Sequence, residues 1–117
     1  MASRVVRKLL LHISDRDKWT IALRLVQSLT DNLPEENYQV VMVADVFAGG
    51  VCLACHRQLR EQMEALTAAG QRILVCAESL RALNLRPEGL PEFAVLITNS
   101  LVEIPRHLEE GYQYLKI

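Results

Sequence analysis

The stretch RILVCAESL at residues 72–80 decides the fold class. Its first part is a short run of mostly branched apolar side chains that ends at Cys76, which is typical of a buried strand. A short helix is predicted from Ala77 to Leu83, and Asn84 breaks it. A strand that passes directly into a helix is the building unit of α/β proteins, so we expect the same unit elsewhere in the chain.

The same unit recurs on both sides of this stretch. Strands are predicted at residues 7–13, 38–44, 72–76 and 93–98, with a short edge strand at 113–117. Apolar residues at helical spacing predict long helices at 19–29, 52–66 and 101–112. Gly70 is expected to end the second of these as a left-handed cap, and Pro105 to lie in the first turn of the last one or to kink it.

Strands that alternate with helices need crossover connections, which give a parallel sheet with helices on both faces. We therefore predict a three-layer, flavodoxin-like α/β fold with a mostly parallel five-stranded sheet. The expected strand order is 2-1-3-4-5, with the strands numbered along the chain. A length of 117 residues fits a single domain over residues 1–117, and no repeat, low-complexity tract or linker divides it.

Composition limits the classes of function. Half of the residues are apolar and 23% are charged, as in ordinary soluble domains. A net charge of −1, and basic residues that are not interleaved with aromatic ones, argue against nucleic acid as a partner. The apolar runs are too short to cross a bilayer and no signal peptide is recognised, so we expect no membrane partner and a cytoplasmic protein with reduced cysteines.

Candidate functional residues follow several of the predicted strands. In sheets of this type, ligands and reacting groups collect at the carboxyl ends of the strands. Cys76 ends one strand, Ser14 and Asp15 follow another with His12 slightly deeper, and the loop 45–50 follows a third. We expect these residues along one edge of the sheet.

Cys76 is the first candidate for a reacting group. A thiol at the start of a helix faces unpaired backbone N–H groups and the positive end of the helix dipole, which both favour the thiolate. The thiolate is the form that attacks the sulfur of a persulfide or disulfide. The alternative is a small apolar residue that fills the end of a strand. His12 is either a core histidine or, because the expected order places its strand beside that of Cys76, a second catalytic candidate.

The string Cys52-Leu-Ala-Cys55-His56 allows several interpretations. The pattern C-x-x-C-H is the attachment signature of c-type haem, but its place inside a predicted helix and the lack of an export signal argue against haem. Cys52 and Cys55 form a redox pair or auxiliary thiols if the helix makes them neighbours. With His56 and a fourth ligand, either His12 or Cys76, they form a zinc site. The last interpretation is core packing, because both cysteines continue an apolar stripe.

The remaining candidates favour structural roles. Asp15 and Asp45 are expected to cap helices or shape turns rather than to act as acids. Trp19 is expected to anchor its helix on the sheet, and His107 to lie at the surface. Gly49-Gly50 before a helix is a weak signal for a phosphate cradle, since no P-loop lysine follows. We therefore expect no cofactor and no bound metal.

The whole chain resembles the DsrE/DsrF-like family, which includes the YchN-like proteins. Four segments carry the resemblance: residues 8–23, residues 38–50, Cys76-Ala-Glu-Ser-Leu80, and residues 110–116. The resemblance implies a flavodoxin-like fold, homo-oligomers built from trimeric units, and a role in handling sulfur. It also implies that Cys76 matches a cysteine that carries sulfane sulfur as a persulfide. The chain departs from the family where relatives often have Asn-Gly and it has Asp45-Val46.

Three functional hypotheses follow. The first is a cytoplasmic sulfur carrier or transfer protein that uses a persulfide at Cys76, with His12 assisting and with Cys52 and Cys55 as auxiliary thiols. Its partners are a protein donor or acceptor of sulfur and further copies of itself, in a trimer or hexamer. The second is a non-catalytic oligomeric binding or scaffold module with packing cysteines. The third is a binder of small molecules at the strand-edge cleft.

Overall fold

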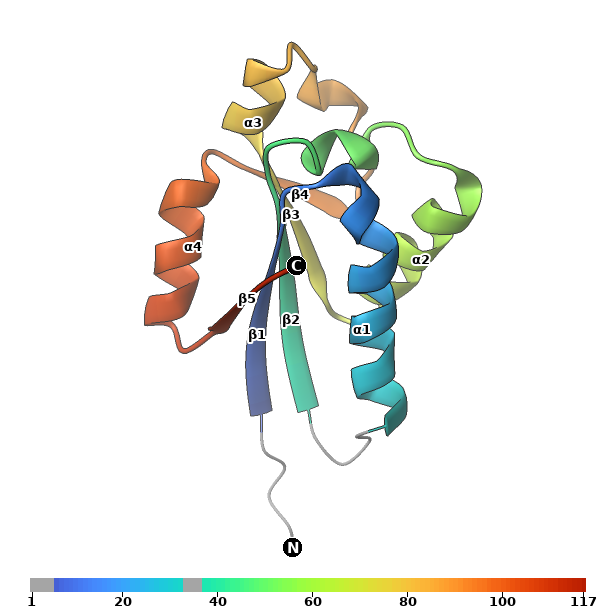
Figure 1. Cartoon of the computed structure of the whole chain (residues 1–117), viewed down its shortest axis with the longest axis vertical. Coiled ribbons are helices and arrows are strands. Elements are labelled where there is room, and N and C mark those ends of the chain that lie inside the picture. Colours follow the sequence, from blue (N-terminus) through green and yellow to red (C-terminus); the bar gives the residue numbers. More distant parts are fainter. Residues whose placement is uncertain (1–5, 33–36) are drawn as a thin grey trace, which may run out of the picture.

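A computed structural model describes residues 6–32 and 37–117, in which five strands form one parallel sheet (Figure 1). The strands are β1 (Val6–Ile13), β2 (Asn37–Ala44), β3 (Arg72–Cys76), β4 (Ala94–Ile97) and β5 (Gln113–Lys116). The helices are α1 (Trp19–Asn32), α2 (Arg57–Ala68), α3 (Ala77–Ala82) and α4 (Ser100–Glu109), with short 3-10 turns η1 (Arg16–Lys18), η2 (Gly49–Cys52) and η3 (Pro87–Gly89). The predicted class, a parallel five-stranded sheet with flanking helices, is confirmed. No helix in the described ranges is long and apolar enough to span a bilayer.

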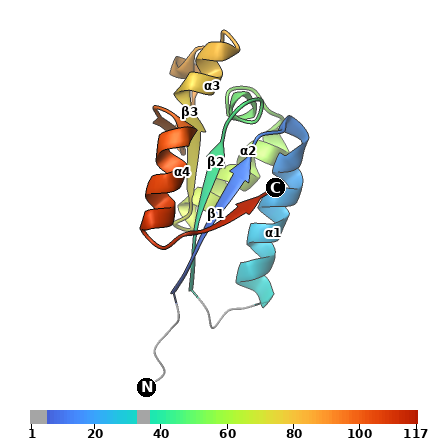
Figure 2. The same cartoon turned by 60° about the vertical axis from the view of Figure 1, so that its left-hand side comes forward.

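The strands lie in the order β4-β3-β2-β1-β5. β1 therefore lies between β2 and β5. The expected order had instead placed the third strand beside the first. The reason is the direction of the crossovers. From β1 to β4, each new strand is added on the same side of the preceding strand, and α1 and α2 lie side by side on one face of the sheet (Figures 1 and 2). α4 then lies on the other face and leads the chain back to β5, which pairs with β1.

An apolar core lies on each face of the sheet. The larger core, under α1 and α2, contains Trp19, Met42 and Met63. Trp19 is fully buried, and its indole N–H donates to the carbonyl oxygen of Ala48 at 2.9 Å, which confirms it as the anchor of α1. The smaller core lies under α4 and consists of Leu10, Val41, Val43, Leu74 and Ile97, with Ile104 and Tyr112 packed against them.

The segment after β2 is not the single long helix that the apolar spacing predicts. Residues 49–52 form a 3-10 turn, and α2 begins only at Arg57. His56 is the N-cap of α2, and its Nδ1 accepts a hydrogen bond from the backbone N–H of Leu59 at 3.2 Å. At the other end, Gly70 has a φ of +99°, so the predicted left-handed cap is confirmed.

The last helix also differs from the prediction. Pro105 lies in the second turn of α4 rather than in the first. His107, expected at the surface, is only 5% exposed. Its Nδ1–H donates to the carbonyl oxygen of Glu103 at 2.9 Å, and its Nε2 accepts from the Arg72 guanidinium at 3.2 Å. His107 is buried because β3 supplies this partner, which the helix sequence alone does not reveal.

Candidate functional site

Polar side chains gather at the carboxyl edge of the sheet, on the face that α4 covers. Side chains alternate between faces along a strand, so His12, Asp45 and Cys76 share the face of the core residues two positions before them. Tyr114 and Lys116 pair in register with Leu10 and His12, which brings β5 to the same face. The expected meeting of His12, Ser14, Cys76 and the start of the loop 45–50 at one edge is therefore found, and Tyr114 and Lys116 join them.

Asp45 is the centre of a hydrogen-bond network and is 7% exposed. Its Oδ1 accepts from Ser14 Oγ at 2.6 Å, and its Oδ2 accepts from His12 Nε2 at 2.7 Å and from Ser100 Oγ at 2.8 Å. Burial acts to raise the pKa of Asp45, but the hydrogen bonds from Ser14, His12 and Ser100 outweigh it and hold the pKa below its usual value. Asp45 also begins a turn, as expected, since its carbonyl oxygen accepts from the N–H of Ala48 at 2.9 Å, while its carboxylate joins the loop after β2 to the end of β1 and the start of α4.

His12 uses both of its ring nitrogens. Nε2 lies 2.7 Å from Asp45 Oδ2, and Nδ1 lies 2.7 Å from the hydroxyl of Tyr114. The expected place of His12 beside the strand of Cys76 is not found, because β2 separates β1 from β3. His12 is instead linked to the thiol indirectly, through Asp45 and Ser100.

Cys76 is the N-cap of α3 and is 2% exposed. Its Sγ accepts a hydrogen bond from the backbone N–H of Ser100 at 3.4 Å. Burial acts to raise the pKa of the Cys76 thiol, but hydrogen bonds from Ser79 and Ser100 outweigh burial and lower the pKa below its usual value. Since α3 has only six residues, these hydrogen bonds, rather than a long helix dipole, favour the thiolate.

Several residues of this edge did not emerge from the sequence. Ser79 lies three residues after Cys76, which is the spacing at which a side chain reaches back to a helix N-terminus, and this signal was available. Tyr114 and Lys116 alternate along the predicted edge strand, but their partners depend on which strand β5 joins. Ser100 lies 24 residues from Cys76, and only the fold brings the two together.

The loop after β2 holds Asp45 next to a strained residue. Val46 has a φ of +50°, a region that β-branched residues rarely adopt. Its N–H donates to Ser79 Oγ at 2.8 Å, while the N–H of Asp45 donates to the carbonyl oxygen of Ile13 at 3.0 Å. Backbone strain held in place by surrounding bonds is found most often at functional sites.

Cys52 and Cys55 lie apart from this network. Cys52 is 2% exposed and packs in the core under α1 and α2, on the opposite face from Cys76, with Cys55 half-buried beside that core. Burial, followed by the neighbouring Cys55, raises the pKa of Cys52 to about 12. Burial also raises the pKa of Cys55. All three cysteines are free thiols, and the two on this side are held in the protonated form at neutral pH.

The zinc-site interpretation of Cys52, Cys55 and His56 finds no support in the described residues. No three histidine, cysteine or acidic side chains of the described ranges lie close enough together to hold a metal ion. His56 has its Nδ1 engaged as a helix cap. A Cβ on Gly49 would meet Val75 Cγ1 at 3.0 Å, so this glycine allows η2 to approach β3 closely.

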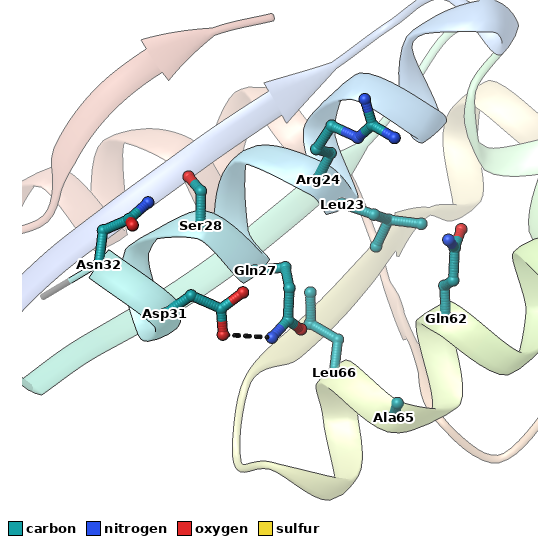
Figure 3. Close-up of a pocket in the computed structure, with 9 residues that line it drawn as sticks. All are labelled: Leu23, Arg24, Gln27, Ser28, Asp31, Asn32, Gln62, Ala65 and Leu66. Carbon is teal, nitrogen blue, oxygen red and sulfur yellow. Dashed lines mark hydrogen bonds between the residues drawn. The ribbon is translucent and has the colours of Figure 1, made fainter. Parts of the chain in front are cut away.

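A groove of about 450 Å³ lies between α1 and α2 (Figure 3). Leu23 and Leu66 line it, together with Gln27, whose side-chain amide donates to Asp31 at 3.1 Å. These helices cover the opposite face from α4, so this groove includes no member of the Asp45 network. The expected cleft for a small molecule at the strand edge is therefore a different place from this groove.

The fold and the site define the class: a parallel α/β domain with a buried thiol and an aspartate-centred network at the carboxyl edge of its sheet. No protein-family model matches the sequence, and no curated protein matches it. The fold is similar to that of MTH1491, a protein of unknown function from Methanobacterium thermoautotrophicum, with a TM-score of 0.80 and 23% identity over 95% of this chain and 99% of that one. It is also similar to the ychN protein from E. coli, with a TM-score of 0.76 and 14% identity over 95% and 99% of the two chains. The YchN-like architecture implied by the sequence resemblance is confirmed at the level of the fold.

Proposed function

We propose that this protein is a small sulfur carrier in which Cys76 holds sulfane sulfur as a persulfide. The observation that carries the proposal is the thiol environment: hydrogen bonds from Ser79 and Ser100 outweigh burial and lower the pKa of Cys76. A thiol with a lowered pKa supplies the thiolate that sulfur transfer requires. The fold shared with the ychN protein is compatible with this role.

The chemical step balances without an external oxidant. The thiolate of Cys76 attacks the outer sulfur of a donor persulfide, R–S–SH. A new S–S bond forms at Cys76, the S–S bond of the donor breaks, and the donor leaves as the thiolate R–S⁻. A protein acceptor takes the sulfur by the same attack on the Cys76 persulfide. The donor leaves as a thiolate and the acceptor attacks as a thiolate, so the sulfur moves without a change in the overall oxidation state.

Access to Cys76 is the structural requirement of this function. The thiol is almost fully buried, so a donor reaches it only when the edge opens. Exposed apolar side chains on β4 and α4, such as Leu96 and Leu101, suit contact with further copies of the chain, in the proposed trimer or hexamer.

The test is sulfur loading followed by mass spectrometry. Reduced protein is incubated with glutathione persulfide, and the modified peptide is identified. We expect a gain of one sulfur atom on Cys76, absent in Cys76→Ala and retained in the matched control Cys55→Ala. Sulfur found only on Cys52 or Cys55, or on no cysteine, contradicts the proposal.

The second candidate function is an oligomeric binding or scaffold module without chemistry. The observation that favours it is the 2% exposure of Cys76, which is also what a packing residue shows. The loading experiment separates the two functions, because a scaffold acquires no sulfur at Cys76 while remaining folded and oligomeric.

A further inference from the structure

Two side-chain contacts join the β1 segment to β5 beside the buried Asp45. His12 Nδ1 lies 2.7 Å from the Tyr114 hydroxyl, and Lys116 Nζ donates to Ser14 Oγ. His12 and Ser14 are two residues apart, as are Tyr114 and Lys116. The two contacts are therefore neighbours, and Ser14 Oγ lies 3.4 Å from His12 Nε2. Tyr114 and Lys116 are exposed, so this pair faces solvent.

We propose that Tyr114 and Lys116 form a binding site for a small oxyanion, and that protonation of His12 opens this site. The site is separate from the Cys76 thiol and does not depend on sulfur transfer. The two groups suit one ligand with two acceptor oxygens, one for the hydroxyl and one for the ammonium, each in a charge-assisted hydrogen bond of about 2.7–2.9 Å.

The first argument is the direction of one hydrogen bond. Asp45 is ionised and only accepts, so the Nε2 of His12 carries a hydrogen in both of its charge states. In the neutral imidazole, Nδ1 has no hydrogen and must accept the O–H of Tyr114, which leaves oxygen lone pairs toward solvent. In the imidazolium, Nδ1–H donates to the Tyr114 oxygen, and the O–H turns outward as a donor for an oxyanion.

The second argument is the local charge. The Asp45 carboxylate and the Lys116 ammonium cancel, so the site is neutral with an uncharged His12 and carries one positive charge with a protonated His12. Lys116 donates one hydrogen to Ser14 and has two more for a ligand. Burial, together with the charge of Asp45, raises the pKa of Tyr114, which keeps its hydroxyl protonated across the neutral range.

Three other ionisable side chains of the surrounding elements have partners of their own. On β1, Lys8 donates to the carbonyl oxygen of Glu110 and lies over the Tyr112 ring. On α4, Glu103 pairs with Arg106 at 3.2 Å and lies near His107. On β3, the Cys76 thiol is bonded to Ser100. His12 is therefore the ionisable side chain in direct contact with the Tyr114 hydroxyl.

The test is a titration of the whole chain with sodium sulfate, observed through the histidine ring signals by NMR, with sodium chloride at matched ionic strength as the control. We expect sulfate to raise the pH at which His12 titrates, while the signals of His56 and His107 do not respond. Above that pH, the sulfate affinity is expected to weaken about tenfold per pH unit, because binding is coupled to one proton.

Matched variants locate the site. Tyr114→Phe and Lys116→Gln are each expected to weaken sulfate binding at least about fivefold, the value of one hydrogen bond of about 1 kcal/mol. The controls Tyr112→Phe and Lys8→Gln lie outside the site and are expected to bind as the unaltered protein does. The proposal is overturned if the sulfate affinity does not change with pH, or if a folded Tyr114→Phe variant binds sulfate as the unaltered protein does. It is also overturned if sulfate does not shift the His12 signal.

Discussion

The side chains of Cys76 and Cys52 have the same solvent exposure, 2% each. The pKa of the Cys76 thiol is nevertheless lower than that of an ordinary cysteine, and the pKa of Cys52 is higher. Burial raises the pKa of Cys52 to about 12, and the neighbouring Cys55 adds to the effect. At Cys76, burial acts in the same direction, but the Ser79 and Ser100 donors reverse it. The comparison teaches that hydrogen-bond donors at the carboxyl edge lower the pKa of one buried thiol, whereas burial raises the pKa of the other.

The largest expected difference between the two cysteines is their rate of alkylation. With a pKa of about 12, only about one Cys52 thiol in 10⁵ is ionised at pH 7. The pKa of the Cys76 thiol is lowered instead, and we expect iodoacetamide to label Cys76 far ahead of Cys52. Peptide mapping of the native protein measures this, with denatured protein as the control for equal intrinsic labelling. Equal native rates would remove the distinction.

The second difference appears in stability at alkaline pH. Cys52 ionises at about 9.0 when unfolded and at about 12 when folded, so the unfolded state loses its proton first as the pH rises. The free energy of unfolding is expected to fall between pH 9 and 12 by up to about 1.4 kcal/mol per pH unit. Urea unfolding of the unaltered protein and of Cys52→Ala checks this, because the variant lacks this part of the slope. Identical slopes would show that Cys52 is not held protonated.

The third prediction concerns the donors themselves. Ser79→Ala removes the side-chain hydrogen bond to the Cys76 thiolate, whereas Ser100→Ala keeps the backbone N–H donor to Cys76 and loses the hydroxyl that donates to Asp45. At about 1 kcal/mol per bond, we expect the alkylation rate of Cys76 at neutral pH to fall about fivefold in Ser79→Ala. Ser28→Ala on α1 is the matched control, since its hydroxyl donates to the carbonyl oxygen of Leu25. An unchanged rate in Ser79→Ala would mean that other groups favour the thiolate.

The smallest expected effect is at Val46. Glycine adopts a φ of +50° without the strain that a β-branched residue has there, so Val46→Gly is expected to stabilise the protein by about 1 kcal/mol. Val102→Gly is the matched control: Val102 is also half-exposed but lies inside α4, where glycine is expected to destabilise by about the same amount. Thermal or urea unfolding measures both. Destabilisation by Val46→Gly would indicate that the side chain has a packing role.

The order of strands explains why part of the site escaped prediction. Residues 72–76 were correctly predicted as a strand from their own apolar run, and Cys76 was correctly placed at its carboxyl end. The position of His12 was not predicted, because which strands are neighbours depends on where the chain reverses direction across the sheet. That reversal follows β4, and it makes β5 rather than β3 the second neighbour of β1.

The segment after β2 shows the same limit at a shorter range. Cys52, Cys55 and Leu59 have helical spacing, but η2, with Gly49 packed against β3, and the cap at His56 interrupt the helix. Apolar spacing shows which residues are buried. It does not show whether the chain between them stays helical, because that depends on packing against the sheet.

The sequence by itself determined the α/β class, most strand positions, the capping glycine at residue 70 and the place of Cys76 at a strand-to-helix turn. These features follow from local patterns of apolar residues and turn residues, which act over a few positions. Only the tertiary structure decided that Asp45 is buried among Ser14, His12 and Ser100, that Ser100 supports the Cys76 thiol, and that β5 brings Tyr114 to His12. Hydrogen bonds between residues that are far apart in the chain depend on strand order and helix placement, and these are set by the packing of the whole domain.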